Sequence, residues 1–382
     1  MDVTGIICEY NPLHLGHKKQ LDIIKATHPD SGIVCLMSGN YVQRGMPAIM
    51  DKSLRAQAAI VCGADLVLEL PVTASLSSAE GFAREGVRIL GNFCNRLCFG
   101  AESADKDTLM ATAQALLSPD FSIALRTQLD KGLSFPAARQ AALQDMGLSA
   151  NILTQPNDIL ATEYCKAILS LELPMESMPI IRQGSYHDTT ADRENPSATA
   201  LRNLMLNRDT WLDYVPEKAK DCLSTAAFHA LSAGEQAILY RLRTMTVLDF
   251  ESLPYGSEGL WRKLMHNART LSTLEEIITA TKSKRYTRTR LDRMVMCAFL
   301  GIMEADIASP APYARVLAFN DKGREILKAA RQTGLFPNVG ETIEHPYQAL
   351  ENRCTSLYSF FSLDNPEPPM AESDRRIFYH RI

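Results

Sequence analysis

Short apolar runs alternate with longer amphipathic segments over the first hundred residues of the chain. The apolar runs cover residues 3–8, 32–37, 66–70 and 96–99, and their length and composition predict buried strands. The intervening segments, at residues 17–26, 53–62 and 77–90, predict helices. Strands that alternate with helices are typical of a parallel sheet covered on both faces. We therefore expect a Rossmann-like α/β core whose ligands bind beyond the carboxyl ends of the strands.

The remaining two thirds of the chain are mostly helical in pattern. Residues 109–173 predict helices, and residues 180–182 predict a last core strand. From about residue 211 the helical pattern resumes, for example at 234–243 and 288–304, and the proline-containing tail from residue 365 is expected to be loose. The 382 residues thus predict a nucleotide-binding core in 1–210, a mostly α-helical region in 211–364 and a tail in 365–382.

Two histidines, three residues apart, follow the first predicted strand. They belong to the string Asn11-Pro12-Leu13-His14-Leu15-Gly16-His17, in which a turn leads into a helix start. A spacing of three puts both imidazoles on one helix face, where free N–H groups and the helix dipole favour anions. Gly16 has no Cβ and allows close ligand approach. This pattern predicts a phosphate site; the alternative is a capped helix with two surface histidines. The string also resembles the HxGH signature of the nucleotidyltransferase superfamily, and that resemblance implies that His14 and His17 are catalytic residues.

A second candidate anion site lies at residues 196–202. Ser197 or Thr199 is placed to cap a helix, and Arg202 falls within the first turns of that helix. Hydroxyls, free backbone N–H groups and a guanidinium together favour phosphate. The segment is similar to the S-[ST]-[ST]-x-[IL]-R element of nucleotidyltransferases, although Ala198 replaces one hydroxyl residue. Taken alone, it would be an ordinary helix cap.

A third cluster of cations follows the second predicted strand. Arg44 lies in a loop, and Lys52 and Arg55 lie three residues apart at a predicted helix start. Cations at that position oppose the helix dipole unless an anion is bound. The three residues are therefore candidate phosphate ligands, and the alternative is a solvated charged loop.

A basic segment near residue 290 is a candidate RNA-binding surface. Its members are Lys282, Lys284, Arg285, Tyr286, Arg288, Arg290 and Arg293. The cations would follow a phosphate backbone, and Tyr286 would stack on an unpaired base. A solvated basic helix face is the alternative.

Composition and charge narrow the classes of protein. The net charge of −4 gives no general attraction to nucleic acid or to anionic membranes, so any polyanion site must be local. No stretch approaches the roughly 20 apolar residues that span a bilayer, and the amino-terminal residues read as a strand rather than a signal peptide. We expect a cytoplasmic protein without membrane or DNA partners. Its nine cysteines are scattered and should be reduced thiols, with no disulfide and no structural metal.

Five strings resemble the bacterial tRNA(Met) cytidine acetate ligases, a family of the HxGH nucleotidyltransferase superfamily. The strings are Gly5-Ile6-Ile7-Cys8-Glu9-Tyr10-Asn11-Pro12-Leu13-His14-Leu15-Gly16-His17, Met37-Ser38-Gly39-Asn40-Tyr41-Val42-Gln43-Arg44-Gly45, Phe99-Gly100-Ala101-Glu102-Ser103, Gln155-Pro156-Asn157-Asp158-Ile159-Leu160 and Lys284-Arg285-Tyr286-Thr287-Arg288. The first string alone indicates only the superfamily. The second and fifth strings are far more specific.

The resemblance implies an ATP-dependent ligase that activates acetate as acetyl-adenylate. The acetyl group would then pass to the exocyclic amine of the wobble cytidine of elongator tRNA(Met), with Mg²⁺ bound to the nucleotide. The ATP contacts implied by the family fall on Ile7, Cys8, Glu9, Tyr10, Asn11, Pro12, Leu13, His14, Leu15, Gly16, His17, Lys18, Lys19, Gln20, Gly100, Asn157 and Arg182. Two alternatives stay open: an adenylyltransferase that acts on a mononucleotide or phosphopantetheine, and a non-enzymatic RNA-binding module that holds ATP. The sequence leaves the oligomeric state open.

Overall fold

A seven-stranded, mostly parallel sheet forms the centre of the molecule. The computed structural model describes residues 1–103, 105–182, 192, 195–283, 285–335, 345–364 and 368–381. The sheet strands are β1 (Val3–Cys8), β2 (Gly32–Ser38), β5 (Leu66–Leu70), β6 (Arg96–Ala101), β7 (Glu176–Ile181), β8 (Val316–Asn320) and β9 (Phe378–His380). Their order is β7-β6-β1-β2-β5-β8-β9, and β3 (Tyr41–Val42) and β4 (Met46–Pro47) form a separate hairpin. The predicted parallel α/β core is confirmed, and the last predicted strand begins earlier, at Glu176.

Helices cover both faces of this sheet. The helices of the first two hundred residues are α1 (Leu15–Thr27), α2 (Lys52–Val61), α3 (Val72–Ser75), α4 (Ala79–Leu90), α5 (Lys106–Leu117), α6 (Pro119–Asp130), α7 (Phe135–Asp145) and α8 (Pro156–Ser170). Alternate residues of β2 enter two separate cores, because side chains of a strand point to opposite faces. Val34 and Leu36 pack with α4 and α8, whereas Ile33, Cys35 and Met37 pack with α1 and α2.

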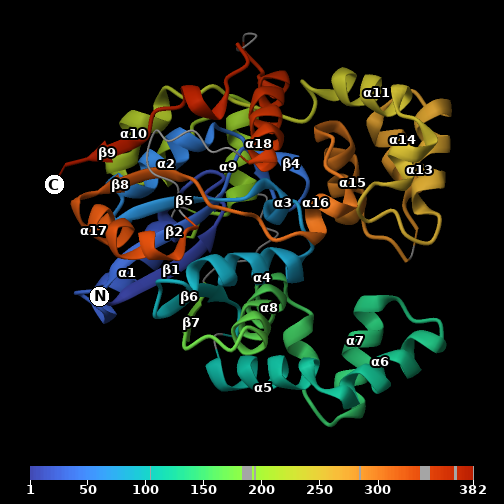
Figure 1. Cartoon of the computed structure of the whole chain (residues 1–382). Coiled ribbons are helices and arrows are strands. Elements are labelled where there is room, and N and C mark those ends of the chain that lie inside the picture. Colours follow the sequence, from blue (N-terminus) through green and yellow to red (C-terminus); the bar gives the residue numbers. More distant parts are fainter. Residues whose placement is uncertain are drawn as a thin grey trace.

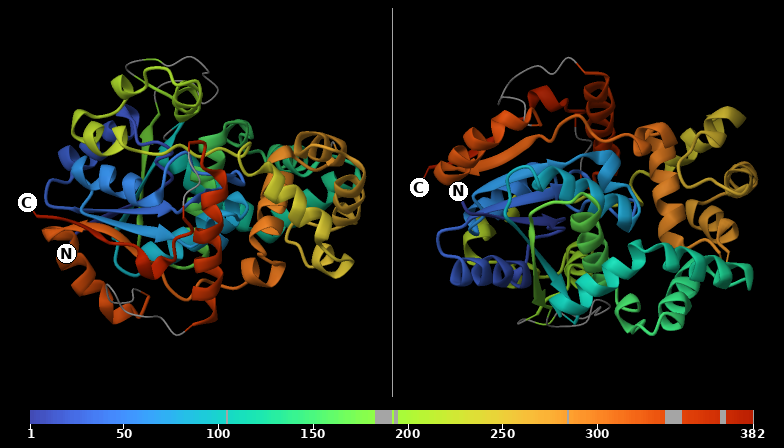
Figure 2. Two further views of the ribbon diagram at one scale, coloured as in Figure 1. Left: turned by 90° about the horizontal axis from the view of Figure 1, so that it is seen from above. Right: turned by 60° about the horizontal axis from the view of Figure 1, so that its bottom comes forward.

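The second half of the chain is mostly helical, as predicted. Its helices are α9 (Ala198–Leu206), α10 (Glu217–Ser224), α11 (Glu235–Thr244), α12 (Val247–Glu251), α13 (Leu260–Thr270), α14 (Leu274–Thr281), α15 (Arg288–Leu300), α16 (Glu304–Ala308), α17 (Asp321–Ala330) and α18 (Pro346–Leu357). Helices α11 to α15 and α18 enclose a third apolar core. Figures 1 and 2 show the lobe formed by α11 to α15 beside the sheet rather than on either of its faces. None of the described helices is both long and apolar enough to cross a membrane.

The division of the chain differs from the predicted boundaries. Trp211, Val215 and Phe228 pack into the core beneath α1 and α2, although they were assigned to the second region. Strand β8 also comes from that region and pairs antiparallel with β5. This pairing satisfies the backbone groups at an otherwise exposed edge of the parallel sheet. The segment 211–364 is therefore not one separate helical domain.

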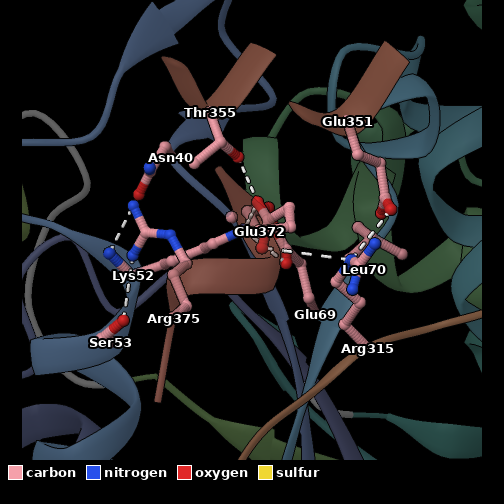
Figure 3. Close-up of polar contacts among 12 residues, drawn as sticks. Asn40, Lys52, Ser53, Glu69, Leu70, Arg315, Glu351, Thr355, Glu372 and Arg375 are labelled. Carbon is pink, nitrogen blue, oxygen red and sulfur yellow. Dashed lines mark hydrogen bonds and ion pairs between the residues drawn. The ribbon is translucent and has the colours of Figure 1, made fainter. Parts of the chain in front are cut away.

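The carboxyl-terminal tail is part of the sheet, so the prediction of a loose tail is wrong for residues 368–381. Strand β9 pairs with β8, and Glu372, in the short 3₁₀ helix η5 (Glu372–Asp374), is buried. Glu372 and Glu69 both bind the buried ammonium of Lys52, at 2.5 and 2.6 Å. Arg375 forms an ion pair with Asp51 at 2.7 Å. Figure 3 shows Lys52 with Glu69 and Glu372. Together with the Arg375 ion pair, these contacts join the end of the chain to the start of α2.

Candidate active site

A pocket of about 980 Å³ opens at the carboxyl ends of β1, β6 and β7. Its wall includes the loop after β1, the start of α1, the start of α8 and most of α9. The chain order reverses at β1, because β2 and β5 follow on one side and β6 and β7 on the other. Ligands of open α/β sheets bind at such a reversal, and the volume suits a nucleotide.

The two histidines of the HLGH string lie together on this wall. His14 is the N-cap of α1, and its Nδ1 accepts a hydrogen bond from the Gly16 N–H at 3.1 Å. The backbone N–H of His14 donates to Nδ1 of His17 at 3.3 Å, and the rings stack with centroids 3.7 Å apart. Since both Nδ1 atoms accept, the hydrogen-bond pattern assigns the proton of each neutral ring to Nε2. A Cβ at position 16 would lie 3.0 Å from the His14 ring, so glycine preserves this packing.

Burial keeps both imidazoles neutral. Burial, the neighbouring His17 ring and the charges of Arg182 and Arg202 hold the pKa of His14 well below its ordinary value. Burial and the charge of Arg182 lower the pKa of His17 to about 3. The buried Nε2 of His14 has no hydrogen-bond partner among the described residues. The pair is therefore suited to donate hydrogen bonds to an anionic ligand without carrying a permanent charge.

Nitrogen-15 NMR of the ligand-free protein should show His14 and His17 as neutral Nε2–H rings at pH 5.5. An ordinary histidine is about 90% protonated at that pH, whereas burial lowers the pKa of both of these rings. A depressed folded-state pKa means that the unfolded chain takes up the proton first. Stability should thus decline as the pH falls below about 6.5. Spectra of His14→Gln and His17→Gln would assign the signals, and an imidazolium signal from either residue would contradict the assigned protonation.

The amino end of α9 lies beside that of α1. Ser197 is the N-cap of α9, and its hydroxyl accepts a hydrogen bond from the Ala200 N–H at 3.0 Å. Arg202 donates to the Asn11 carbonyl at 2.8 Å and to the Thr199 hydroxyl at 3.0 Å. Ser197, Thr199 and Arg202 all line the pocket. Two helix amino ends therefore converge on one cavity, an arrangement that favours phosphate.

A third part of the wall joins β6, β7 and α8. Arg182 donates to the Asn157 side-chain carbonyl at 3.0 Å, and the Asn157 amide donates to Glu102 at 2.6 Å. Gly100 lies next to them, and a Cβ there would meet only the Cβ of Arg182, at 4.0 Å. The protein thus leaves space above Gly100 that a ligand can enter. The structure brings all three predicted contacts, Gly100, Asn157 and Arg182, to the pocket of the histidines.

Basic side chains outnumber acidic ones around this pocket. The cations that line it are Lys19, Arg44, Arg182 and Arg202, and the acids are Glu9 and Asp22. Positive charge is therefore concentrated here, although the whole chain is acidic. No group of three or more His, Cys, Asp or Glu residues that could hold a metal ion occurs in the described parts of the chain. A divalent cation would have to arrive largely on the phosphates of a nucleotide.

The prediction that Lys52 and Arg55 bind phosphate is wrong. Lys52 is buried and binds Glu69 and Glu372 (Figure 3). Arg55 is fully buried and donates to the backbone carbonyls of Glu9, Ser38, Gly39 and Met50. The protein itself supplies the negative groups that these cations require near the start of α2. Arg44 is exposed and does line the pocket.

Most of the other predicted nucleotide contacts line the pocket. They are Ile7, Cys8, Glu9, Tyr10, Asn11, Gly16, Lys19 and Gln20. Pro12, Leu13, Leu15 and Lys18 are absent from its wall. Leu13 is instead in the core beneath α1, and Lys18 pairs with Asp22. The geometry therefore does not support direct contact between the ligand and the side chains of these four residues.

Several lining residues were missed by the sequence interpretation. Phe82, Phe99 and Tyr164 form an apolar part of the wall near Gly100, and the rings of Phe99 and Tyr164 lie 5.4 Å apart. Phe99 directly precedes Gly100 at a strand end, which was the available signal. His229 also lines the pocket and stacks on Tyr358 at 4.0 Å. No motif surrounds His229, so only the tertiary structure could place it there.

The predicted RNA-binding segment is largely paired with acidic or carbonyl groups. Arg285 binds Glu258 at 2.7 Å, and Arg288 binds Glu275 at 2.7 Å and Asp292 at 3.0 Å. Arg290 donates to the backbone carbonyl of Tyr255 and to the hydroxyl of Ser257. Lys282 is exposed.

Arg293 is buried over the Tyr255 ring, so the prediction that it contacts RNA is wrong. Lys284 lies outside the described residues. For Lys282, Arg285, Tyr286, Arg288 and Arg290, RNA binding stays a prediction, weakened by the acidic partners of three of them, Arg285, Tyr286 and Arg288.

Comparison with known proteins agrees with this geometry. The pattern of the HIGH nucleotidyl transferase family matches residues 1–373. A tRNA(Met) cytidine acetate ligase of Clostridium perfringens is 35% identical over 387 residues, which cover 95% of this chain and 96% of that protein. The corresponding protein of Clostridium acetobutylicum is 33% identical and covers 99% of both chains. The chain belongs to the tRNA(Met) cytidine acetate ligase family of HIGH nucleotidyl transferases.

Solved structures of this family share the whole fold. Crystal structures of Thermotoga maritima TmcAL, one of the apo protein and one bound with alpha-thio ATP, match the full length of both chains at 29% identity. Their TM-scores are 0.90 and 0.87. The protein is thus an enzyme of the ligase class, with the α/β core and helical region that the family has in three dimensions.

Proposed function

We propose that the enzyme uses ATP to activate acetate and transfers the acetyl group to the wobble cytidine of elongator tRNA(Met). The observation that carries this proposal is the convergence of a neutral histidine pair, two helix amino ends and Arg182 and Arg202 on one pocket. The names of the relatives, and the alpha-thio ATP bound by the Thermotoga maritima protein, support the choice of substrates.

In the first step an acetate oxygen attacks the α-phosphorus of ATP. The bond from that phosphorus to the bridging oxygen of the pyrophosphate breaks, and acetyl-adenylate and pyrophosphate are formed. His14 and His17 would donate hydrogen bonds from Nε2 to phosphate oxygens on which charge develops. Arg182, Arg202 and the N–H groups at the start of α9 would hold the remaining phosphate oxygens. Magnesium, carried on the nucleotide, would neutralise part of the pyrophosphate charge.

In the second step the exocyclic amine of the cytidine attacks the acetyl carbonyl carbon. The bond between that carbon and the phosphate oxygen of AMP breaks, the amine loses a proton, and N-acetylcytidine and AMP result. Phe82, Phe99 and Tyr164 border the part of the pocket beside Gly100 and are suited to pack against an adenosine. His229, Ala230 and Leu231 line the pocket where the second half of the chain borders it.

Mass analysis of tRNA provides the direct test. After incubation with the protein, ATP and acetate, nuclease digests of elongator tRNA(Met) should contain one cytidine that has gained an acetyl group. A transcript with uridine at the wobble position should remain unmodified, because it lacks the exocyclic amine. Omission of acetate should abolish the product.

Pyrophosphate release separates this proposal from its alternatives. If a mononucleotide or phosphopantetheine supported release from labelled ATP and acetate did not, the enzyme would be a small-molecule adenylyltransferase. Absence of any turnover, with ATP and tRNA both bound, would indicate a binding module instead.

A further inference from the structure

The outer face of α13 carries a row of basic side chains. Arg262, Lys263, His266 and Arg269 are all exposed, and the helix contains no Asp or Glu. Residues three, four and seven apart lie on the same side of a helix. The opposite side is buried in the core of the lobe through residues such as Leu260 and Leu264. From Arg262 to Arg269 the row extends about 10 Å along the axis.

The neighbouring elements do not neutralise this face. Helices α11, α12 and α14 pack against α13. These helices and the loop before α13 contain six acidic residues, and five of them bind groups other than the basic row. Glu258 binds Arg285 and Tyr286, and Glu275 binds Arg288. The other three accept hydrogen bonds close to helix starts: Glu235 from the Leu274 N–H, Asp249 from Thr246, and Glu276 from the N–H groups of Ser272 and Thr273. Glu251 is the sixth and is exposed. Among the described residues, no acidic side chain forms an ion pair with the four residues of the row.

An aromatic ring and the predicted basic segment adjoin the row. The Arg262 guanidinium lies 5.0 Å from the Trp261 ring. Glu258, two residues before the start of α13, holds Arg285 and Tyr286 through its two carboxylate oxygens. The amino end of α13 and the segment around residue 285 therefore lie side by side. Cations next to half-buried aromatic rings are typical of surfaces that contact RNA backbone and unpaired bases.

We infer that the exposed face of α13 binds the phosphate backbone of the acceptor RNA. The inference rests on the proposed function, which supplies an RNA substrate to an otherwise acidic protein. Arg262, Lys263 and Arg269 have no acidic partner among the described residues, although Arg269 donates one hydrogen bond to the Met245 carbonyl at 3.4 Å. The charge complementarity of these three cations with a polyanion carries the inference. The sequence interpretation favoured the segment 282–293, but Arg285 and Arg288 there already have acidic partners, so α13 is the stronger attractor of phosphate.

Charge removal from α13 tests this inference. The variant Arg262→Gln with Lys263→Gln should bind elongator tRNA(Met) about tenfold more weakly at low salt. Raising the salt from 50 to 200 mM should also weaken tRNA binding about tenfold less in this variant than in the parent. The reason is that each lost phosphate contact lowers the slope of log affinity against log salt by about 0.9. The matched control is Arg324→Gln with Lys328→Gln, two exposed cations of α17 on the far side of the molecule (Figure 1). Fluorescence anisotropy gives the affinities, and thermal melting verifies that both variants are folded.

The outcomes distinguish this inference from the proposed function. Acetate-dependent ATP–pyrophosphate exchange without RNA should be equal in both variants and the parent, since α13 does not line the pocket. If the parent acetylates tRNA and the α13 variant binds it as tightly as the control does, the inference fails and the proposed function stands. If polyglutamate competes as well as tRNA for the parent, the partner is an acidic protein and the inference is wrong. If the parent activates acetate but neither binds nor modifies tRNA, the acceptor in the proposed function is wrong as well.

Discussion

Replacing His17 with alanine should lower acetate-dependent ATP–pyrophosphate exchange by at least about 100-fold, the usual scale for loss of one preorganised hydrogen-bond donor. The His17 ring is locked by the His14 N–H and by stacking on the His14 ring. Its donor is therefore in place before the reaction and needs no reorganisation as charge develops on phosphorus. The variant should lose turnover more than ATP affinity, because Arg182, Arg202 and the amino ends of α1 and α9 still hold the phosphates of bound ATP.

Two further substitutions make this test specific. His17→Gln keeps an N–H donor near the same position and should retain more exchange activity than His17→Ala. His28→Ala is the matched control, because His28 is the C-cap at the other end of α1, away from the pocket. Thermal melting should show that all three variants are folded. Unchanged exchange in His17→Ala would show that the histidine face is not catalytic.

Replacing Lys52 with methionine should destabilise the protein by about 3–5 kcal/mol at pH 8, the range for breaking one side of a buried ion pair. Lys52 and Glu372 are buried, and Glu69 is nearly so. Burial alone would raise the pKa of Glu372, but the charges of Lys52 and Arg375 lower it below the ordinary value. Without the ammonium, the carboxylates of Glu69 and Glu372 would face each other in the interior, and the Arg315 guanidinium, 3.9 Å from Glu372, would compensate them only in part. Urea denaturation measures the difference in free energy of unfolding.

The loss should depend on pH in a defined direction. In the variant, burial without Lys52 should hold the carboxyl pKa values above the ordinary value of 4.5. A group with a raised folded-state pKa loses its stabilising contribution as the pH rises through that pKa. The deficit of Lys52→Met relative to the parent should therefore shrink between pH 8 and pH 5.

Neutralising one acid in the same background provides the control. Lys52→Met with Glu372→Gln should be more stable at pH 8 than Lys52→Met alone, because one uncompensated buried charge is removed. ATP affinity of the folded variants should match the parent, since Lys52 does not line the pocket. Equal urea midpoints for the parent and Lys52→Met would mean that the cluster is hydrated and carries no net stability.

The same cluster contains a second group with an unusual protonation state. Burial and the neighbouring Glu69 raise the pKa of Glu351 to about 7. Glu351 also accepts a hydrogen bond from Tyr313 at 2.5 Å and binds Arg315 at 2.9 Å. Figure 3 shows Arg315 between Glu351 and the Lys52 group. The carboxyl-terminal residues are thus anchored by charges whose balance depends on pH.

Local patterns predicted the features that depend on residues near each other in the chain. Continuous apolar runs predicted β1, β2, β5 and β6, because a strand buried on both faces needs apolar side chains at every position. The HLGH string predicted a turn followed by a helix. The cap of that helix is local in sequence, because His14 accepts a hydrogen bond from the N–H of Gly16, two residues later. Ser197 or Thr199 was expected to cap α9, and the structure shows that Ser197 does so.

Only the tertiary structure decided which partners the charged residues have. Lys52 and Arg55 have the sequence position of phosphate ligands, yet Glu372, which lies 320 residues after Lys52, and buried carbonyl groups satisfy them. Likewise β8 and β9 complete the sheet from the far end of the chain, and His229 joins the pocket through packing alone. Secondary structure and helix capping follow from side chains a few residues apart, which the sequence displays. The burial and pairing of a charge depend on groups that only folding brings within a few ångströms.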